Sequence, residues 1–179
     1  MITFAVWKGE NPSGRVLLPD TRDQKWKEFA DEFEKDAAAP SPSPPEEKNG
    51  QLARKELIAG LTANGVAKAY PLSALEQQSP IIDSVGGVQL VVVMEDDKKS
   101  VRAFEATIDG QHLEFYTKPD AKPVRLVDQE TGSEWNFSGR CISGPMTGRQ
   151  LKRMNVLTEY WFDWKYHHPS TAIYNLQPG

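Results

Sequence analysis

Cysteine is nearly absent from this chain, since Cys141 is the only one in 179 residues. An intrachain disulfide, a cysteine-rich zinc site and an iron–sulfur cluster held by this chain alone are therefore excluded. Long apolar runs are missing too, because no stretch approaches the roughly 20 apolar residues that a membrane-spanning helix needs. Residues Met1 to Trp7 are too few, and lack the charged start, to be a signal peptide. We expect a soluble chain without a direct membrane span; a piece cut from a secreted or anchored parent would show the same features.

Runs of basic residues are also missing. The chain has 21 basic and 25 acidic residues and a net charge of -4, which lacks the electrostatic footprint of a nucleic-acid-binding protein. Binding to anionic membranes is disfavoured for the same reason. The glycines Gly139, Gly144 and Gly148 match neither the phosphate-loop nor the dinucleotide fingerprint. We therefore predict no nucleic-acid partner, no nucleotide site and no cofactor.

Aromatic residues and turn formers are present in numbers that favour short strands. The chain is 39% hydrophobic, with five Trp, seven Phe and five Tyr, and it has 13 Gly and 13 Pro. The length falls in the usual single-domain range and suffices to bury a core without disulfide or metal support. We therefore predict one β-rich domain with an appendage.

The appendage is predicted to contain a helix. Asp20 or Thr21 can cap it, Gln24 completes a capping box, and the chain should leave the helix before Pro40. Its apolar face carries Trp26, Phe29, Ala30 and Phe33. A Pro-rich, charged stretch follows and reads as an extended connector. The predicted organisation is an appendage at 1–39, a connector at 40–50 and a β-rich domain at 51–179, all in one structural unit.

Three dipeptides predict tight hairpin turns between strands: Asn64-Gly65, Gly86-Gly87 and Asp109-Gly110. The run from Val88 to Met94 is almost continuously apolar, which predicts a central strand covered on both faces. Successive hairpins favour a meander.

Further strands are predicted at Val124 to Val127 and at Glu134 to Ile142. The segment Thr158 to His167 places Trp161 and Trp164 at helical spacing and predicts a short helix that ends before Pro169. The fold class is therefore mainly β (α+β), an antiparallel hairpin-rich sheet or barrel with an N-terminal helix and a short C-terminal helix.

Several short motifs occur in one order between residues 57 and 174, which makes them more specific than any single motif. They are Ala69-Tyr-Pro-Leu72, Asp83-Ser-Val-Gly-Gly87, Asp109-Gly110 with Leu113 and Phe115, Asp128-Gln-Glu-Thr-Gly-Ser-Glu-Trp135, Gly144-Pro145 with Gly148, and His168-Pro-Ser-Thr171. Together they resemble the bacterial and archaeal domain of unknown function three-one-seven-nine. The resemblance implies no assigned activity, and it implies a secreted or membrane-associated parent for many members.

Typical members of the resembling family carry a Tyr-Cys-Pro-Leu-Cys-Gly motif after the long apolar strand, which suits metal or thiol chemistry. This chain has an acidic and basic turn there, from Glu95 to Lys99, without a sulfur pair. It therefore cannot perform that chemistry in the same way. The acidic run Glu95-Asp96-Asp97 also lacks the ligand spacing and closing glutamate of a calcium loop.

The Asp109-Gly110 turn predicts a register in which Phe104 faces Phe115 and Ala106 faces Leu113 on the core side. The other side brings Glu105 opposite Glu114, with His112 diagonal to them. These three side chains are candidates for a metal site or an acid and base pair. The alternative is a solvated outer face of the sheet, as alternation alone predicts.

Cys141 is a candidate nucleophile, because Arg140 beside it favours the thiolate and flanking glycines offer backbone donors. No base is identifiable, and strand parity with Trp135 and Phe137 carries the thiol to the apolar side. The alternative is a buried, inert thiol.

Near the C-terminus, Glu159, Asp163 and His167 recur every four residues. They predict either an exposed ion-pair ladder or a metal site on a helix face. His168 is predicted to donate a hydrogen bond in the core or at the helix end.

The leading functional hypothesis is a non-catalytic binding or interaction module. Its loops, especially Glu95 to Lys99 and Cys141 to Arg149, would meet a small-molecule or protein partner. The alternative is a metal-dependent or thiol enzyme that uses Glu105, Glu114 and His112, or Cys141. An enzyme requires those side chains to converge in a cleft, whereas a module leaves them apart.

Overall fold

The computed structural model describes residues 1–17, 20, 26–29, 31–32 and 52–176. The chain divides into two compact units, one made of Met1–Trp7 with Leu52–Gly179 and the other of Lys8–Gln51. The first seven residues thus belong with the β-rich part. The division at residues 39 and 50 stays a prediction. The Pro-rich connector at 40–50 lies outside the described residues. Of the helix predicted from Asp20 or Thr21, residues 26–29 and 31–32 are helical, and its ends lie outside the description.

The helices with defined bounds are α1 (Phe4–Glu10), α3 (Leu72–Gln77) and α4 (Trp161–His167). The first strands are β1 (Leu57–Ala63), β2 (Val66–Pro71), β3 (Ile81–Val85), β4 (Val88–Met94), β5 (Val101–Glu105), β6 (Thr107–Ile108) and β7 (Gln111–His112). The later ones are β8 (Phe115–Thr117), β9 (Arg125–Asp128), β10 (Glu134–Asn136), β11 (Cys141–Ser143), β12 (Arg153–Met154), β13 (Val156–Tyr160) and β14 (Ala172–Ile173). None of the helices in the described part of the chain has the length and apolar character needed to span a bilayer.

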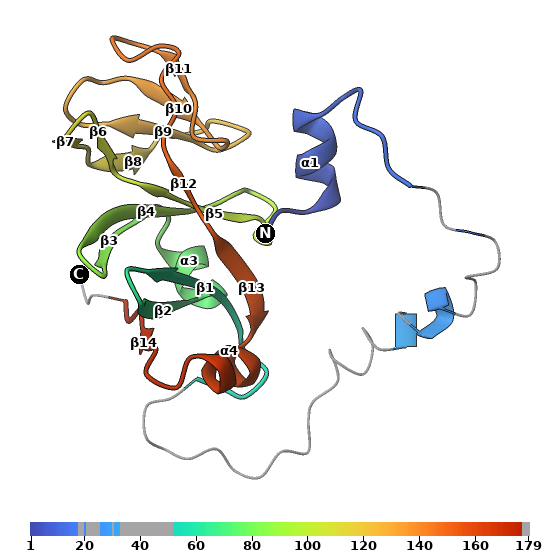
Figure 1. Cartoon of the computed structure of the whole chain (residues 1–179). Coiled ribbons are helices and arrows are strands. Elements are labelled where there is room, and N and C mark those ends of the chain that lie inside the picture. The colour runs from blue at the N-terminus through green and yellow to red at the C-terminus, as the bar shows by residue number, and fades with distance from the viewer. Residues whose placement is uncertain (18–19, 21–25, 30, 33–51, 177–179) are drawn as a thin grey trace. The chain divides into compact units, whose positions relative to one another are not determined.

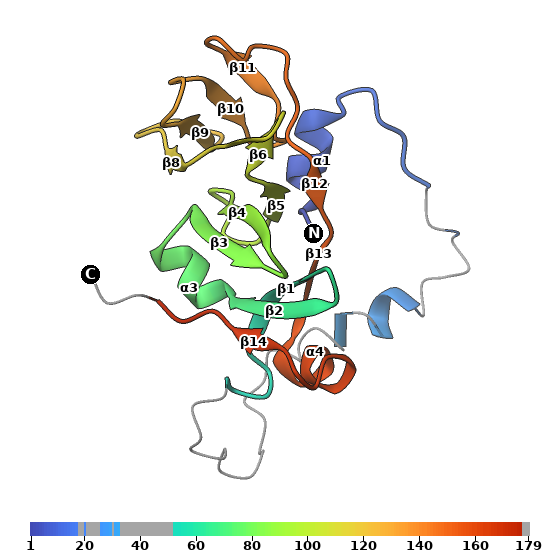
Figure 2. The same cartoon turned by 60° about the vertical axis from the view of Figure 1, so that its left-hand side comes forward.

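The strands of the β-rich unit form three open four-stranded sheets and a short ribbon, so the fold is mainly β as predicted. Sheet A has the order β13-β1-β2-β14, sheet B the order β12-β5-β4-β3, and sheet D the order β11-β10-β9-β8. The ribbon, which is sheet C, pairs β6 with β7. All described pairs are antiparallel except β14 with β2. Sheet B lies between sheets A and D, and β12 and β13 run in succession from sheet B to sheet A (Figures 1 and 2).

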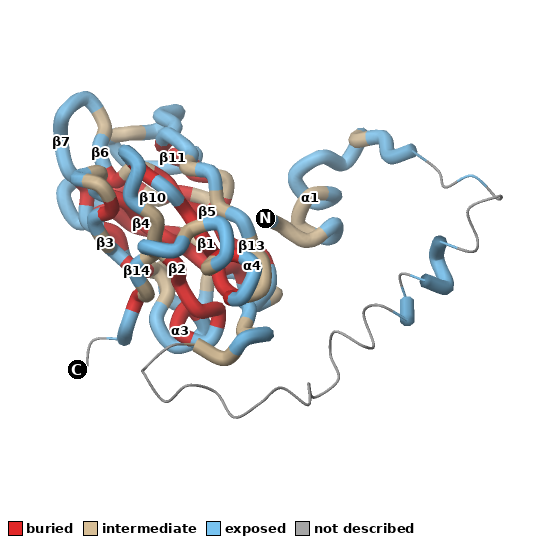
Figure 3. The backbone as a smooth tube through the Cα atoms, turned by 60° about the horizontal axis from the view of Figure 1, so that its bottom comes forward, coloured by how far each residue is buried: buried red, intermediate tan, exposed pale blue. Residues whose placement is uncertain are grey.

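Strand β4 is central, as its continuous apolar run predicts. Leu90, Val92 and Met94 face the core that sheet B shares with sheet A and α3. Val91 and Val93 point the other way, into the core between sheet B and sheet D. Because both faces of this strand are covered, neither face can be polar, which explains why the run does not alternate. Figure 3 shows buried stretches along the strands of this unit.

Helix α4 covers the outer face of sheet A. Trp161 and Trp164, the pair predicted from helical spacing, are both buried against Ile58 and Ala69. Gly60 on β1 permits this packing, because a Cβ added there would come within 2.5 Å of the Trp164 ring. The indole Nε1 of Trp164 donates to the Thr171 hydroxyl at 2.8 Å, which holds the chain after the helix.

The three predicted hairpin turns are confirmed. Asn64-Gly65 joins β1 to β2, Gly86-Gly87 joins β3 to β4, and Asp109-Gly110 joins β6 to β7. All six residues have positive φ, as two-residue type I′ turns require.

Two predicted segments are wrong in their extent. The strand predicted over Glu134 to Ile142 is two strands, β10 and β11, because the chain reverses at Gly139, whose φ is +81° and whose N–H donates to Asn136. The helix predicted over Thr158 to His167 begins at Trp161. Its first three residues extend β13, because their backbone pairs with β1 instead.

Candidate functional site

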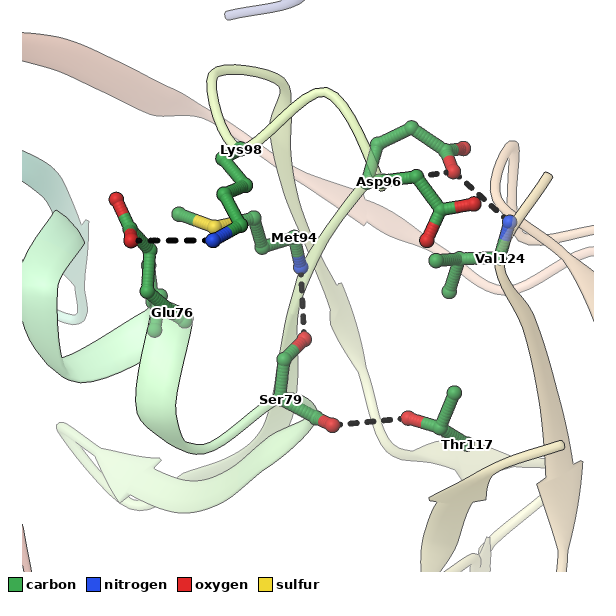
Figure 4. Close-up of a pocket in the computed structure, with 9 residues that line it drawn as sticks. Glu76, Ser79, Met94, Asp96, Lys98, Thr117 and Val124 are labelled. Atoms are coloured by element: carbon green, nitrogen blue, oxygen red, sulfur yellow. Dashed lines mark hydrogen bonds and ion pairs between the residues drawn. The ribbon is translucent and has the colours of Figure 1, made fainter. Parts of the chain in front are cut away.

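One cavity in the described residues has a volume of about 230 Å³ and lies where four segments meet (Figure 4). They are α3 with the residues after it, the end of β4 with the turn that follows, β8, and the residue before β9. The apolar lining residues are Leu75, Met94 and Val124, the hydroxyl residues are Ser79 and Thr117, and the charged residues are Glu76, Glu95, Asp96 and Lys98. We call this cavity the β4-end pocket.

Hydrogen bonds fix one wall of the β4-end pocket. The Ser79 hydroxyl oxygen accepts the backbone N–H of Met94 at 3.0 Å. The Thr117 hydroxyl donates to the Ser79 carbonyl at 2.8 Å. Figure 4 shows these bonds linking the segment after α3 to both β4 and β8. The wall is therefore preformed.

The turn after β4 is held by Asp97. Its carboxylate accepts the backbone N–H groups of Lys99 and Ser100 at 2.9 and 2.7 Å. It also accepts the hydroxyls of Ser100 and Thr3 at 2.6 and 2.7 Å. Burial alone would raise the pKa of Asp97, but these hydrogen bonds outweigh it and lower the pKa below its ordinary value. Asp97 thus fixes the turn and leaves its neighbours to line the pocket.

Glu95 is the buried charge of the pocket, with only 6% of the residue exposed. Its Oε1 accepts the backbone N–H of Val124 at 2.8 Å and that of Asp96 at 3.0 Å. No described residue forms a hydrogen bond or ion pair with Oε2. A carboxylate oxygen has two lone pairs, so Glu95 offers acceptor capacity that the fold leaves unused.

Lys98 is the cationic group of the same pocket, but it is paired elsewhere. Its Nζ lies 3.6 Å from a carboxylate oxygen of Glu76 on α3, and both side chains are well exposed (Figure 4). The pair forms part of the rim. The charged lining therefore carries three carboxylates and one ammonium group, an excess of negative charge.

A second depression lies beside the β6–β7 ribbon and includes the end of the predicted loop Cys141 to Arg149. It is lined by Thr107, Ile108, Asp109, Gly148, Arg149, Gln150 and Lys152. Arg149 is paired with Asp109, and Lys152 lies 2.6 Å from the Glu105 carboxylate. Because each cation here already has an acidic partner, this depression presents no unused charge.

The structure does not gather the predicted metal ligands Glu105, Glu114 and His112. The predicted pairing of Thr107 with His112 is confirmed, and the backbone N–H of Leu113 still donates to the Ala106 carbonyl at 2.8 Å. Beyond that point the strands diverge, because β5 and β8 enter different sheets. Glu105 pairs with Lys152, while Nδ1 of His112 lies 3.0 Å from a backbone carbonyl oxygen. Among the described residues, no group of three or more His, Cys, Asp or Glu is arranged to hold a metal ion. A metal role for these residues stays a prediction.

Cys141 lies on β11 opposite Trp135, within the core between sheets B and D. Its thiol is buried and donates to the Ser143 carbonyl at 3.3 Å. Burial raises the pKa of the Cys141 thiol, which disfavours the reactive thiolate. A nucleophilic role stays a prediction, and the thiol's surroundings favour the inert alternative.

The residues predicted near the C-terminus lie on two elements but stay close to one another. His167 lies 3.7 Å from Asp163 on an exposed face of α4. Glu159 belongs to β13, and burial together with the nearby Asp163 carboxylate raises its pKa above the ordinary value. His168 caps α4 through its backbone N–H, which donates to Trp164, and its ring packs 3.9 Å from the Trp164 ring centroid. The contacts of His168 are therefore those of a residue that ends a helix, which agrees with one of its two predicted positions.

Two networks explain motifs that carry the family resemblance. Asp128 is fully buried and accepts the indole N–H of Trp135 at 2.8 Å. Asp83 accepts the Tyr70 hydroxyl at 2.8 Å and lies 2.6 Å from the Lys68 ammonium group. Burial and then this hydrogen bond raise the pKa of Tyr70 above its ordinary value, so the phenol stays a donor. The first network joins β9 to β10, and the second joins β2 to β3.

Sequence reasoning selected the turn from Glu95 to Lys99 but missed the burial of Glu95. The sequence could have indicated this burial. Alternate residues of a strand share a face, and Glu95 follows Val91 and Val93, which face sheet D. It also missed Ser79, Thr117 and Val124 as pocket residues. Nothing local marks them, since they come from separate segments that only the fold brings together.

Comparison with curated proteins and with solved structures finds no match to the chain. Comparison with protein families finds a match over residues 1–171 to the family described as Protein of unknown function (DUF3179). That match covers nearly the whole chain and agrees with the resemblance carried by its motifs. The chain belongs to the DUF3179 family of proteins of unknown function.

Proposed function

We propose that this protein is a non-catalytic binding module and that the β4-end pocket is its ligand site. The observation that carries the proposal is Glu95, a buried carboxylate that lines the cavity and keeps one oxygen without a partner among the described residues. Oε2 is not one of the fully buried side-chain atoms that lack a hydrogen-bond partner, so this oxygen stays accessible from the cavity while Oε1 is held by the fold. A bound ligand can donate a hydrogen bond to this accessible oxygen in place of water.

The framework of the pocket supports binding over catalysis. The turn and the wall are fixed by hydrogen bonds of Asp97, Ser79 and Thr117, so the cavity is preformed, as ligand sites usually are. The pocket contains neither a histidine nor a cysteine. The groups that the enzyme hypothesis requires lie elsewhere in the fold.

A fragment titration followed by amide NMR shifts tests this proposal. The fragment set contains cationic, neutral and anionic compounds of a few heavy atoms. Binding in the pocket predicts that at least one class shifts the amide signals of Met94, Asp96 and Val124. Fragments that shift none of them, whatever their charge, contradict the proposal.

Two matched variants locate the binding. Asp96 is exposed and lines the pocket, so Asp96→Trp places an indole over the opening without touching the core. Lys99 is exposed on the same turn but does not line the pocket, so Lys99→Trp is the control. We expect the shifts to vanish in the first variant and to persist in the second. Shifts that persist equally in both place the binding elsewhere.

A further inference from the structure

We infer that the ligand of the β4-end pocket carries a primary alkylammonium group that binds Glu95 Oε2. This inference rests on the proposed function and names the chemical class of its ligand. It follows from three features of the pocket: the donors that are already used, the charges that line it, and its size.

The backbone donors at the pocket are used by the fold. The N–H of Met94 donates to Ser79, and the N–H groups of Val124 and Asp96 both donate to Glu95 Oε1. The Thr117 hydroxyl donates its hydrogen to the Ser79 carbonyl, which leaves its oxygen only as an acceptor. Two donors remain, the hydrogen of the Ser79 hydroxyl and the ammonium group of Lys98, which lies at the exposed rim. Beside Glu95 the unused capacity is that of acceptors, so a ligand that reaches this carboxylate must bring hydrogen-bond donors.

The charge of the lining selects a cationic donor. Glu76, Glu95 and Asp96 contribute three negative charges against the single positive charge of Lys98, which is already paired with Glu76. Glu95 has no ion-pair partner among the described residues. Hydrogen bonds between ionised partners are about twice as strong as neutral ones, so a cationic donor suits the accessible Oε2 better than a neutral donor does.

A single ammonium group fits these acceptors better than a metal ion does. The described residues contain no group of three or more carboxylate, imidazole or thiol side chains arranged around one ion position. Divalent cations such as calcium require six to eight oxygen ligands in a shell. An ammonium group requires up to three acceptors, which one carboxylate oxygen and its polar neighbours can supply.

The volume of the pocket and its apolar wall indicate the size and the apolar character of the part of the ligand that carries the ammonium group. The cavity of about 230 Å³ is smaller than the roughly 300–1,000 Å³ of pockets that hold drug-sized ligands. Leu75, Met94 and Val124 provide an apolar surface beside the carboxylates. A short alkyl chain that ends in an ammonium group satisfies both, and it occurs in free alkylamines and in lysine side chains.

Isothermal titration calorimetry with butylammonium, butanol and butyrate tests the inference, because the three probes share an alkyl chain and differ in charge and donors. We expect butylammonium to bind, and butanol and butyrate to bind at least about tenfold more weakly, the effect of one charged hydrogen bond. Equal binding of all three, or preference for butyrate, overturns the inference while the pocket itself remains a binding site. Binding of calcium without binding of butylammonium also overturns it.

Two isosteric variants assign the contact. Glu95→Gln keeps an acceptor for the N–H groups of Val124 and Asp96 but removes the charge, so it should weaken butylammonium binding about tenfold or more. Glu114→Gln removes an exposed carboxylate outside the pocket and should bind as the unchanged protein does. An unchanged affinity of a folded Glu95→Gln protein overturns the assignment.

A last comparison separates the two sources of the ammonium group. The peptide Gly-Gly-Lys-Gly-Gly presents a lysine side chain, and its binding is compared with that of butylammonium. Tighter binding of the peptide supports a lysine of a partner protein as the ligand group. Tighter binding of butylammonium supports a free alkylamine. Failure of both to bind overturns the inference.

Discussion

The Glu95 carboxylate accepts the backbone N–H of Val124 at 2.8 Å and so joins the end of β4 to the start of β9. The two residues are 29 positions apart in sequence, and the strands belong to sheets B and D. Glu95 therefore has a structural role through Oε1 and an unused oxygen in Oε2. Substitutions can separate the two roles.

The first prediction concerns the stability of the ligand-free protein. Glu95→Gln retains the acceptor for Val124, so its free energy of unfolding should be equal to or higher than that of the unchanged protein, because a buried charge is removed. Glu95→Ala leaves the Val124 N–H buried without an acceptor and should cost about 1–3 kcal/mol. Urea unfolding of both variants measures the difference. Equal destabilisation by Gln and Ala would contradict the assigned hydrogen bond.

The second prediction concerns acid stability through Asp97. A carboxyl group whose pKa is lowered in the folded state stabilises the protein above its unfolded pKa, and this stabilisation is lost as the pH falls through the folded pKa. Asp97→Asn should therefore be less stable than the unchanged protein at about pH 7, and the difference should shrink toward about pH 3.

The control for Asp97 is Asp96→Asn on the same turn, because the Asp96 side chain accepts no hydrogen bond from the described residues. Urea unfolding of both variants across this pH range makes the comparison. A difference for Asp97→Asn that is constant with pH would show that the carboxylate charge does not stabilise the turn.

The third prediction concerns the Cys141 thiol. Since burial shields it and raises its pKa, the folded protein should react with iodoacetamide at least about tenfold more slowly than the same protein in denaturant. Mass spectrometry of the alkylated protein over time measures both rates. Rapid alkylation of the folded protein would contradict this prediction and support the hypothesis that Cys141 is a nucleophile.

The fourth prediction concerns the packing of α4. Gly60→Ala brings a Cβ within 2.5 Å of the Trp164 ring, so the helix must shift, at a cost of about 1–3 kcal/mol. Gly9→Ala is the control, because an added Cβ there meets nothing within 4 Å. Thermal unfolding of the two variants compares them. Equal melting temperatures would show that Trp164 does not pack on Gly60 as described.

The sequence predicts those parts of the fold that local chemistry determines. Asn64-Gly65 and Asp109-Gly110 require positive φ at both residues, so their turns could be placed to the residue. The continuous apolar run of β4 identified the central strand. The division of the strands into three sheets could not be predicted, because pairings such as β13 with β1 join segments about 100 residues apart, and no local pattern encodes them.

The site was predicted only in part, for the same reason. The turn from Glu95 to Lys99 is visible in the sequence as a charged break after an apolar strand. Thr117 and Val124 come from other strands, and the turn residue Asp97 needs Thr3 from the start of the chain to complete its hydrogen bonds. Parity indicates that Glu95 faces inward, but only the assembled sheets show that a cavity lies beside it.

The central claim is that Glu95 Oε2 receives an ammonium group in the β4-end pocket, and a crystal structure of the protein with butylammonium tests it most directly. We predict density for the alkyl chain against Leu75, Met94 and Val124, with the nitrogen about 2.7–2.9 Å from Oε2. An empty pocket at saturating butylammonium, or a bound molecule whose nitrogen points away from Glu95, would contradict it.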